Sequence, residues 1–195
     1  QRLILFDTKL IEKFSLDRVQ RSGARFDEQR LLWMNGQWIR RIDLDDLYER
    51  VAPYWPASAN SADTTYKKHV LSLVQDRLKT LAELSMMTSY FFEEPRENWS
   101  LIADNKQLGK LERSEISHIL QAAHDSLAQL DDWTAEHIQE VLNGLLDSLQ
   151  QKPGIVFSLI RIATTWAPFS PQLNDTLALL GKETTLRRIS NSLST

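Results

Sequence analysis

Apolar residues recur three or four positions apart through most of this chain, which is the spacing of helices that bury one face. No Asn-Gly turn joins two alternating segments as in a β-hairpin. Asn35-Gly36 instead lies inside a helical pattern, where the glycine is a tolerated or close-packing position. The spacing predicts helices over residues 9–13, 27–40, 44–51, 63–78, 80–91, 112–130, 134–150, 155–165, 170–180 and 183–193. The predicted fold class is therefore all-α.

Residues typical of helix ends flank several of these segments. Asp43 and Thr134 stand where an N-cap side chain accepts hydrogen bonds from the first free amides. Ser170 is predicted as an N-cap with Pro171 at the first helical position, and Gly181 as a C-cap. The charged segment 93–100 contains a proline and interrupts the periodicity, so it is the predicted boundary between two helical modules.

The composition is that of an ordinary globular protein, with 42% hydrophobic and 25% charged residues among 195. The absence of cysteine excludes a disulfide framework and a thiolate metal site and suits a reducing compartment, so we expect a cytoplasmic protein. No apolar run approaches the about 18–20 residues that cross a bilayer, and we expect no membrane partner.

The charge distribution is uneven along the chain. A net charge of -3 argues at first against a nucleic-acid partner. Residues 1–41 nevertheless hold nine Lys or Arg against five Asp or Glu, whereas residues 93–150 hold four against twelve. Such asymmetry hints at an oriented surface, although solvated charged faces explain most cases.

Constellations that carry catalysis or bind metals are missing. The four histidines are scattered, and the Glu115–His118 pair is only half of a di-iron carboxylate motif. The carboxylate pairs Asp45-Asp46 and Asp131-Asp132 stand at presumed helix starts, where capping explains them. No cluster of glycines could cradle a phosphate. We therefore predict no catalytic residue and no metal site, and we expect the chain itself not to be an enzyme.

Two arginines stand among apolar helical positions without a local acidic partner. No Asp or Glu lies three or four positions from Arg77 or from Arg161. Their methylene stems could lie along apolar surface with the guanidinium in water, or a carboxylate from another helix could neutralise them. Alternatively, their planar forks donate to a base edge or a phosphate of RNA.

Several blocks of the sequence, in order, resemble the end of bacterial glutamyl-tRNA synthetases. Residues 77–92 read RLKTLAELSMMTSYFF and are similar to the family's R-x-x-T-L-x-E-x6-Y-F-F block. Residues 170–173 and 179–189 read SPQL and LLGKETTLRRI, close to its S-P-x-L and L-L-G-K-E-x-x-L-R-R-I. Residues 9–19, 25–27 and 32–39 are similar to the segments that follow the catalytic half. No HIGH-like or KMSKS-like motif and no Rossmann half is present.

The resemblance implies a helical anticodon-binding cage of two modules, 42–95 and 96–195, preceded by the tail of a stem-contact region, 1–41. It places Arg77 on the arginine that recognises cytosine at the third anticodon letter and rejects the guanine of glutamine tRNA. It places Arg161 on a second anticodon-contacting arginine. Ser170, Pro171 and Leu173 fall on a turn that contacts anticodon bases.

The implied function is recognition of the glutamate tRNA anticodon arm within a ligase that joins glutamate to tRNA. ATP and Mg²⁺ serve that whole enzyme, and we expect no cofactor in this chain and a monomeric state. The alternative is a helical protein-interaction module that descends from a synthetase and binds little RNA. The acidic middle of the chain is compatible with that alternative.

One residue departs from the family pattern near the second arginine. Trp166 stands where the family has glycine. Because tryptophan adopts the left-handed conformation of a helix cap less readily than glycine, we expect the path from Trp166 to Pro168 to differ from the family's.

Overall fold

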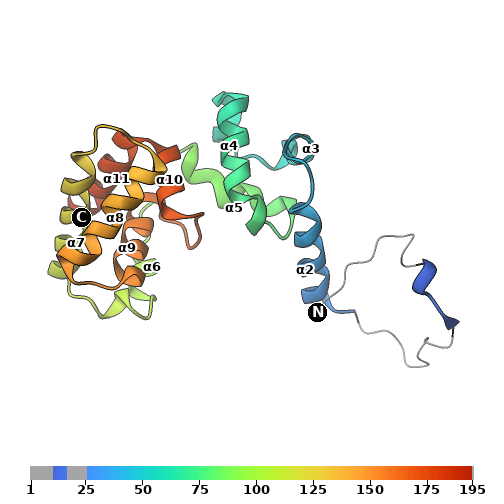
Figure 1. Cartoon of the computed structure of the whole chain (residues 1–195), viewed down its shortest axis with the longest axis horizontal. Coiled ribbons are helices and arrows are strands. Elements are labelled where there is room, and N and C mark those ends of the chain that lie inside the picture. The colour runs from blue at the N-terminus through green and yellow to red at the C-terminus, as the bar shows by residue number, and fades with distance from the viewer. Residues whose placement is uncertain (1–10, 17–25, 195) are drawn as a thin grey trace.

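The computed structural model describes residues 11–16 and 26–194, and every regular element in these ranges is a helix. Figure 1 shows two groups of helices side by side. The first group contains α2 (Glu28–Ile39), α3 (Leu44–Arg50), α4 (Thr64–Val74) and α5 (Leu84–Thr88). The second contains α6 (Ser100–Ala103), α7 (Arg113–Ala128), α8 (Ala135–Leu149), α9 (Pro153–Thr165), α10 (Leu173–Leu180) and α11 (Lys182–Ser194). The predicted all-α fold is confirmed.

Short 3-10 turns join the helices of the first group. They span Ala52–Tyr54, Ala57–Ser61, Gln75–Arg77, Leu81–Glu83 and Ser89–Phe91, and one more, Leu108–Lys110, follows α6. The helix predicted over 63–78 therefore ends at Val74 and tightens into the turn that carries Arg77. The helix predicted over 80–91 is α5 between two such turns, and the Thr88 hydroxyl donates to the Leu84 carbonyl, a local bond that competes with helical geometry.

Helix ends follow the sequence where a local side chain caps them. Asp43 and Thr134 accept hydrogen bonds from the amides of Asp45 and His137, and Gly181 adopts φ 83° at the end of α10. The prediction for Ser170 and Pro171 is wrong, because α10 begins at Leu173 with Gln172 as its N-cap. The helix predicted over 9–13 begins at residues outside the described ranges. Its described part, residues 11–13, is helical.

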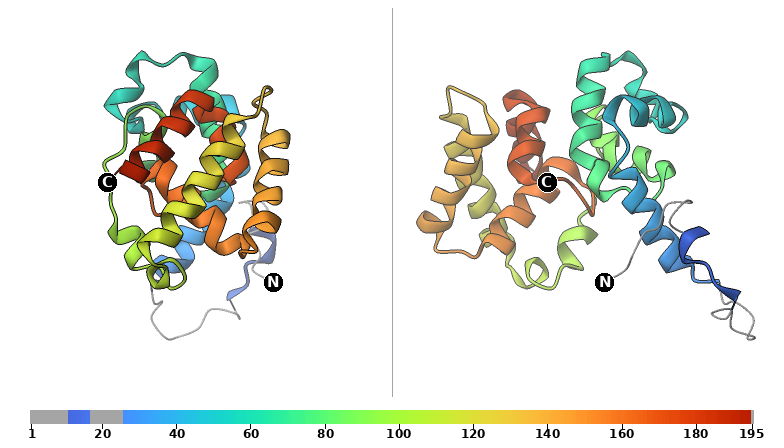
Figure 2. Two further views of the ribbon diagram at one scale, coloured as in Figure 1. Left: turned by 90° about the vertical axis from the view of Figure 1, so that its left-hand side faces the viewer. Right: turned by 45° about the vertical axis from the view of Figure 1, so that its right-hand side comes forward.

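Each group of helices has its own apolar core. The smaller core includes Ile39, Leu47 and Leu71, and the larger one extends from Ile102 to Ile189. A third cluster, which we call the junction cluster, consists of Val70, Tyr90, Phe91 and Ala167. Figure 2 shows the segment between α9 and α10 reaching from the second group toward the first. The boundaries predicted at residues 41 and 95 stay predictions.

The junction cluster is supplemented by polar contacts. The Tyr66 hydroxyl lies 3.2 Å from the Phe91 carbonyl and 3.3 Å from the Leu179 carbonyl, so a side chain of α4 contacts the backbone of both groups. The Trp55 and Tyr66 rings each meet Phe92 edge-on, with centroids 5.6 and 5.8 Å away. The two groups therefore contact each other through the Tyr66 hydroxyl as well as through the junction cluster, and the rings of Trp55, Tyr66 and Phe92 pack together within the first group.

Two helices end on non-glycine residues in the left-handed conformation, and one of them offers a simple test. Gln150, exposed after α8, has φ 51°. Replacing Gln150 with glycine should stabilise the chain by about 0.5–1 kcal/mol in urea unfolding, because glycine removes the steric cost of this conformation. The matched control is Gln129→Gly, because Gln129 is also an exposed helix cap but has φ −78°. That variant should lose stability, and a gain in both would contradict the explanation.

Candidate nucleic-acid interface

Arg77 lies on the turn that follows α4 and is exposed. Its side chain makes no hydrogen bond or ion pair with any of the described residues. The tertiary carboxylate that could have neutralised it is therefore absent from the described part of the chain. Its guanidinium is free to bind an external acceptor.

Arg161 lies on α9, half-buried, and points toward the segment before α10. Its Nε donates to the Ser170 hydroxyl at 2.8 Å, and that hydroxyl lies 3.2 Å from the carbonyl oxygen of Pro171. The Ser170 hydroxyl is thus engaged with Arg161 and Pro171 and not with the first free amides of α10. The structure thus brings three of the predicted site residues together.

The predicted turn offers little side-chain surface of its own. Ser170, Pro171 and Leu173 are buried, and Leu173 belongs to the larger core. Phe169, by contrast, is 59% exposed. A ligand at this turn would therefore meet backbone groups and the exposed Pro168 and Phe169 rather than the three predicted side chains.

The buried Tyr90 lies within electrostatic range of both Arg77 and Arg161. Its side chain is buried, and its hydroxyl has no hydrogen-bond partner among the described residues. Burial raises the pKa of the Tyr90 hydroxyl, and the charges of Arg77 and Arg161 partly oppose that effect. Burial also lowers the pKa of Arg161, and the like charge of Arg77 adds to this. The two groups of helices thus contribute one arginine each to the surroundings of Tyr90.

Two cavities open beside this region. One, of about 250 Å³, is lined by Arg161 together with Leu101, Asp104, Asn105, Ser158, Ile162, Ala167 and Pro168. The other, of about 600 Å³, lies between the first group and the end of α9, with Met86, Tyr90 and Trp166 among its lining residues. Both cavities share Ala167 and Pro168. Their walls mix apolar and polar residues, and the larger cavity also includes Glu93, Glu94 and Arg96.

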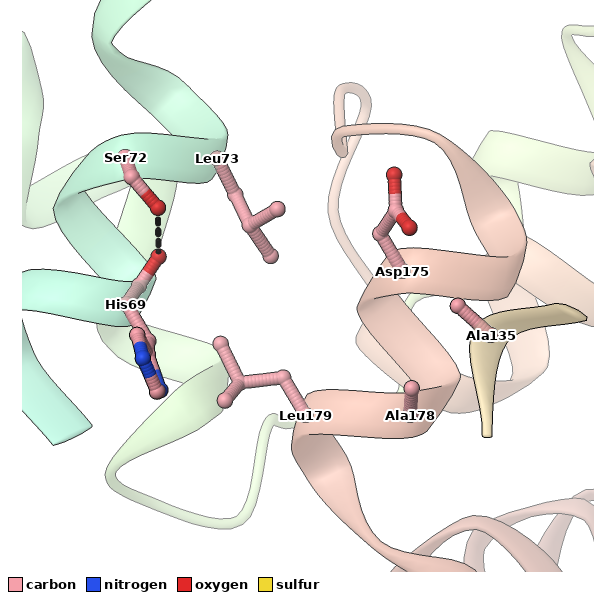
Figure 3. Close-up of a pocket in the computed structure, with 7 residues that line it drawn as sticks. All are labelled: His69, Ser72, Leu73, Ala135, Asp175, Ala178 and Leu179. Carbon is pink, nitrogen blue, oxygen red and sulfur yellow. Dashed lines mark hydrogen bonds between the residues drawn. The ribbon is translucent and has the colours of Figure 1, made fainter. Parts of the chain in front are cut away.

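A third cavity lies elsewhere on the junction. It measures about 310 Å³, and Figure 3 shows His69, Ser72 and Leu73 of α4 facing Asp175 and Leu179 of α10 across it. Its only hydrogen bond among the residues drawn joins the Ser72 hydroxyl to the His69 carbonyl at 2.8 Å. It shares no lining residue with the cavities beside Arg161.

The described residues contain no group of three or more His, Asp or Glu side chains that could hold a metal ion. Within the same residues, no helix is both long and apolar enough to cross a membrane.

The family model described as "Anticodon binding domain" matches residues 46–193. The chain belongs to the anticodon-binding domain family. A glutamate–tRNA ligase of Roseiflexus castenholzii is 36% identical over 98% of this chain and 38% of its own length. One of Chloroflexus aurantiacus is 32% identical over 98% of this chain and 39% of its own length. The chain thus spans a little over a third of these relatives.

Solved structures agree on the fold of this anticodon-binding domain. A glutamate tRNA ligase from Elizabethkingia meningosepticum superposes with a TM-score of 0.72 at 21% identity, over 96% of this chain and 36% of that one. A glutamate–tRNA synthetase from Elizabethkingia anophelis gives 0.71 at 19% identity. The helical arrangement is therefore that of a known architecture.

Sequence reasoning missed Arg188, which joins the two halves of the anticodon-binding domain. This arginine of α11 is 4% exposed and donates to the carbonyl oxygens of Thr164, Tyr90 and Glu93 at 2.8–3.0 Å. Its Nε also donates to Glu94 at 3.2 Å. Partial burial raises the pKa of Glu94, but hydrogen bonds and charge from Arg187 and Arg188 outweigh this and leave the pKa lowered.

Proposed function

We propose that this chain binds the anticodon arm of glutamate tRNA as the recognition part of a glutamate–tRNA ligase. The observation that carries the proposal is the pair Arg77 and Arg161. They come from the two groups of helices, approach one buried tyrosine, and have no carboxylate partner among the described residues. Two guanidinium groups left unneutralised in this way favour an anionic ligand with hydrogen-bond acceptors.

Within this proposal, Arg77 distinguishes cytosine from guanine at the third anticodon letter. Cytosine presents acceptors to a guanidinium fork, and a purine is bulkier at the same position. Arg161 makes a second contact with a base or a phosphate, and the backbone at Ser170, Pro171 and Leu173 adjoins it. The membership of the chain in the anticodon-binding domain family supports this assignment.

The proposal extends to the surroundings of the chain. It includes a cytoplasmic location and a monomeric state, and no cofactor for this part of the ligase. We assign ATP and Mg²⁺, which the resemblance implies for the whole enzyme, to other parts of the ligase.

Binding of an anticodon stem-loop tests the proposal directly. Two RNAs that differ only by C or G at the third anticodon letter should bind with different affinities, and Arg77→Gln should reduce that ratio by about tenfold, since hydrogen-bonded base contacts are worth roughly 1–3 kcal/mol. Arg77→Lys should retain the salt dependence but lose most of the ratio, because lysine lacks the planar fork. Kd values from fluorescence anisotropy provide the measurement.

Salt dependence separates RNA recognition from a protein-interaction role. Affinity for the stem-loop should fall as the salt concentration rises, and Arg161→Met should weaken the binding of both RNAs alike. If Arg161 contacts a phosphate, the slope of log affinity against log salt concentration should become shallower by about one in this variant. Salt-independent binding, or an absence of binding by the wild-type chain, would refute the proposed function. An unchanged ratio in Arg77→Gln would refute only the role of Arg77.

A further inference from the structure

The turn that carries Arg77 is bound to α2 on both sides of the arginine. Before Arg77, the Nε atom of Arg40 donates to the Asp76 carbonyl at 2.7 Å. After it, the Asn35 side-chain amide donates to the Lys79 carbonyl. Each of these carbonyls therefore has its position set by a side chain from the end of α2.

The turn also binds back to α2. The Gln75 side-chain amide donates to the carbonyls of Ile39 and Ile42 at 2.9 and 2.8 Å, which satisfies acceptors at the C-terminal end of α2. The backbones approach closely at Gly36, where a Cβ atom would lie 3.2 Å from the Leu78 carbonyl oxygen. The expectation of a close-packing glycine is confirmed, and side-chain volume at position 36 would push against the turn.

The segment just after Arg77 is also held by a residue that follows it in the chain, Glu83. The Glu83 carboxylate accepts hydrogen bonds from the amides of Lys79 and Thr80 at 2.8 and 3.1 Å, which completes a capping box. Backbone groups on either side of Arg77 are therefore held, whereas its own side chain is exposed and has no partner among the described residues. A fixed backbone that presents an unpaired side chain is the arrangement that a recognition contact requires.

We propose that Arg40 and Asn35 are positioning residues that set the orientation of Arg77 and thereby its discrimination at the third anticodon letter. This inference rests on the proposed function of Arg77. Discrimination between two bases depends on the direction of the guanidinium fork, and misplacement by a fraction of an ångström weakens a directional contact more than it weakens general attraction to phosphates. Loss of either anchor therefore lowers selectivity more than affinity.

The adjacent arginine provides a matched control. Arg41 is exposed, and its side chain makes no hydrogen bond or ion pair with any residue in the described ranges. Arg40→Met and Arg41→Met remove the same charge one residue apart, but only the first removes an anchor of the turn. The experiment measures Kd for the C-containing and G-containing stem-loops with both variants, Asn35→Ala, Arg77→Gln and the wild-type chain, together with thermal unfolding of each.

We expect the ratio of the affinities for the C-containing and G-containing stem-loops to fall about 3- to 10-fold in Arg40→Met and Asn35→Ala and to stay unchanged in Arg41→Met. This is smaller than the roughly hundredfold loss that can follow when a functional group is displaced by a full ångström. Both methionine variants should lose similar affinity for the G-containing stem-loop, because each removes one charge, and only Arg40→Met should lose a further factor of about 3 to 10 for the C-containing one. Arg40→Lys, which can still donate to the Asp76 carbonyl, should recover part of the ratio.

Two outcomes would overturn the inference while leaving the proposed function intact. In the first, Arg40→Met and Arg41→Met have equal ratios although Arg77→Gln loses discrimination. In the second, Arg40→Lys restores the melting temperature but not the ratio, so the contact is only structural. If Arg77→Gln itself keeps the wild-type ratio, the role of Arg77 fails first and this inference with it.

Discussion

Arg188→Ala should destabilise the folded chain by about 3–5 kcal/mol, the range found when one partner of a buried charged contact is removed. The variant leaves the buried carbonyls of Thr164 and Tyr90 without their donor, and each unsatisfied group costs about 1–3 kcal/mol. Urea unfolding measures the effect. The carbonyls come from both groups of helices, so we also expect the contact between the groups to weaken.

The neighbouring arginine again serves as the control. The Arg187 side chain is 49% exposed and bonds only to Glu94, at 2.9 Å, among the described residues. Exposed ion pairs contribute about 0–1 kcal/mol, so Arg187→Ala should change stability by less than about 1 kcal/mol. Equal effects of the two substitutions would contradict the role assigned to Arg188.

Trp166→Ala should cost about 3–5 kcal/mol, and Trp166→Gly about 1 kcal/mol less. The Trp166 side chain belongs to the larger core and meets the Trp99 ring at 5.2 Å between centroids, a contact that both variants lose. Only glycine removes the steric cost of the left-handed conformation, φ 44° and ψ 33°. The difference between the two variants therefore separates packing from backbone strain.

Denaturant unfolding of both variants, with Trp166→Phe as a conservative comparison, provides the measurement. The phenylalanine variant should be the least destabilised of the three, because it retains a ring in the core. A glycine variant as stable as the wild type would show that Trp166 packing contributes little. An alanine variant more stable than the glycine variant would show that the left-handed conformation is not a source of strain.

Trp166 also shows the limit of a local argument. Tryptophan adopts the left-handed cap less readily than glycine, and Trp166 adopts it nevertheless, whereas the expected difference in the path to Pro168 stays a prediction. The reason is tertiary: burial of the indole against Trp99 outweighs a local cost of about 1–2 kcal/mol. A propensity read from the chain cannot include a partner that is distant in sequence.

The sequence likewise predicted helix ends correctly where the capping group is near in sequence, and wrongly where distant residues decide. The caps at Asp43, Thr134 and Gly181 use groups a few residues away, and the sequence predicted them. Ser170 looked equally suitable as a cap, but the hydrogen bond from Arg161 engages its hydroxyl. The predicted helix over 63–78 was too long because contacts with α2 hold residues 75–77 in a tighter turn.

The candidate site shows what a sequence can and cannot supply. The lack of local acids around Arg77 and Arg161 was visible in the sequence, and the structure adds that both approach Tyr90. Arg188 was harder to recognise, because Arg187 beside it is chemically identical and exposed. The available signal was weak: Arg188 shares a helical face with Thr185 and Ser192, small residues that leave room for a buried guanidinium.

The Arg188 contacts also impose an order on how the site is assembled. Arg188 follows the Tyr90 and Glu93 carbonyls that it binds by 98 and 95 residues. A ribosome that has completed α2–α5 has therefore made Arg77 and its turn, but the last of the segments that fasten the first group to the second emerges only with α11. The first group can reach its local structure early during translation, whereas the contacts that fix it against the second group are complete only after α11 has been synthesised.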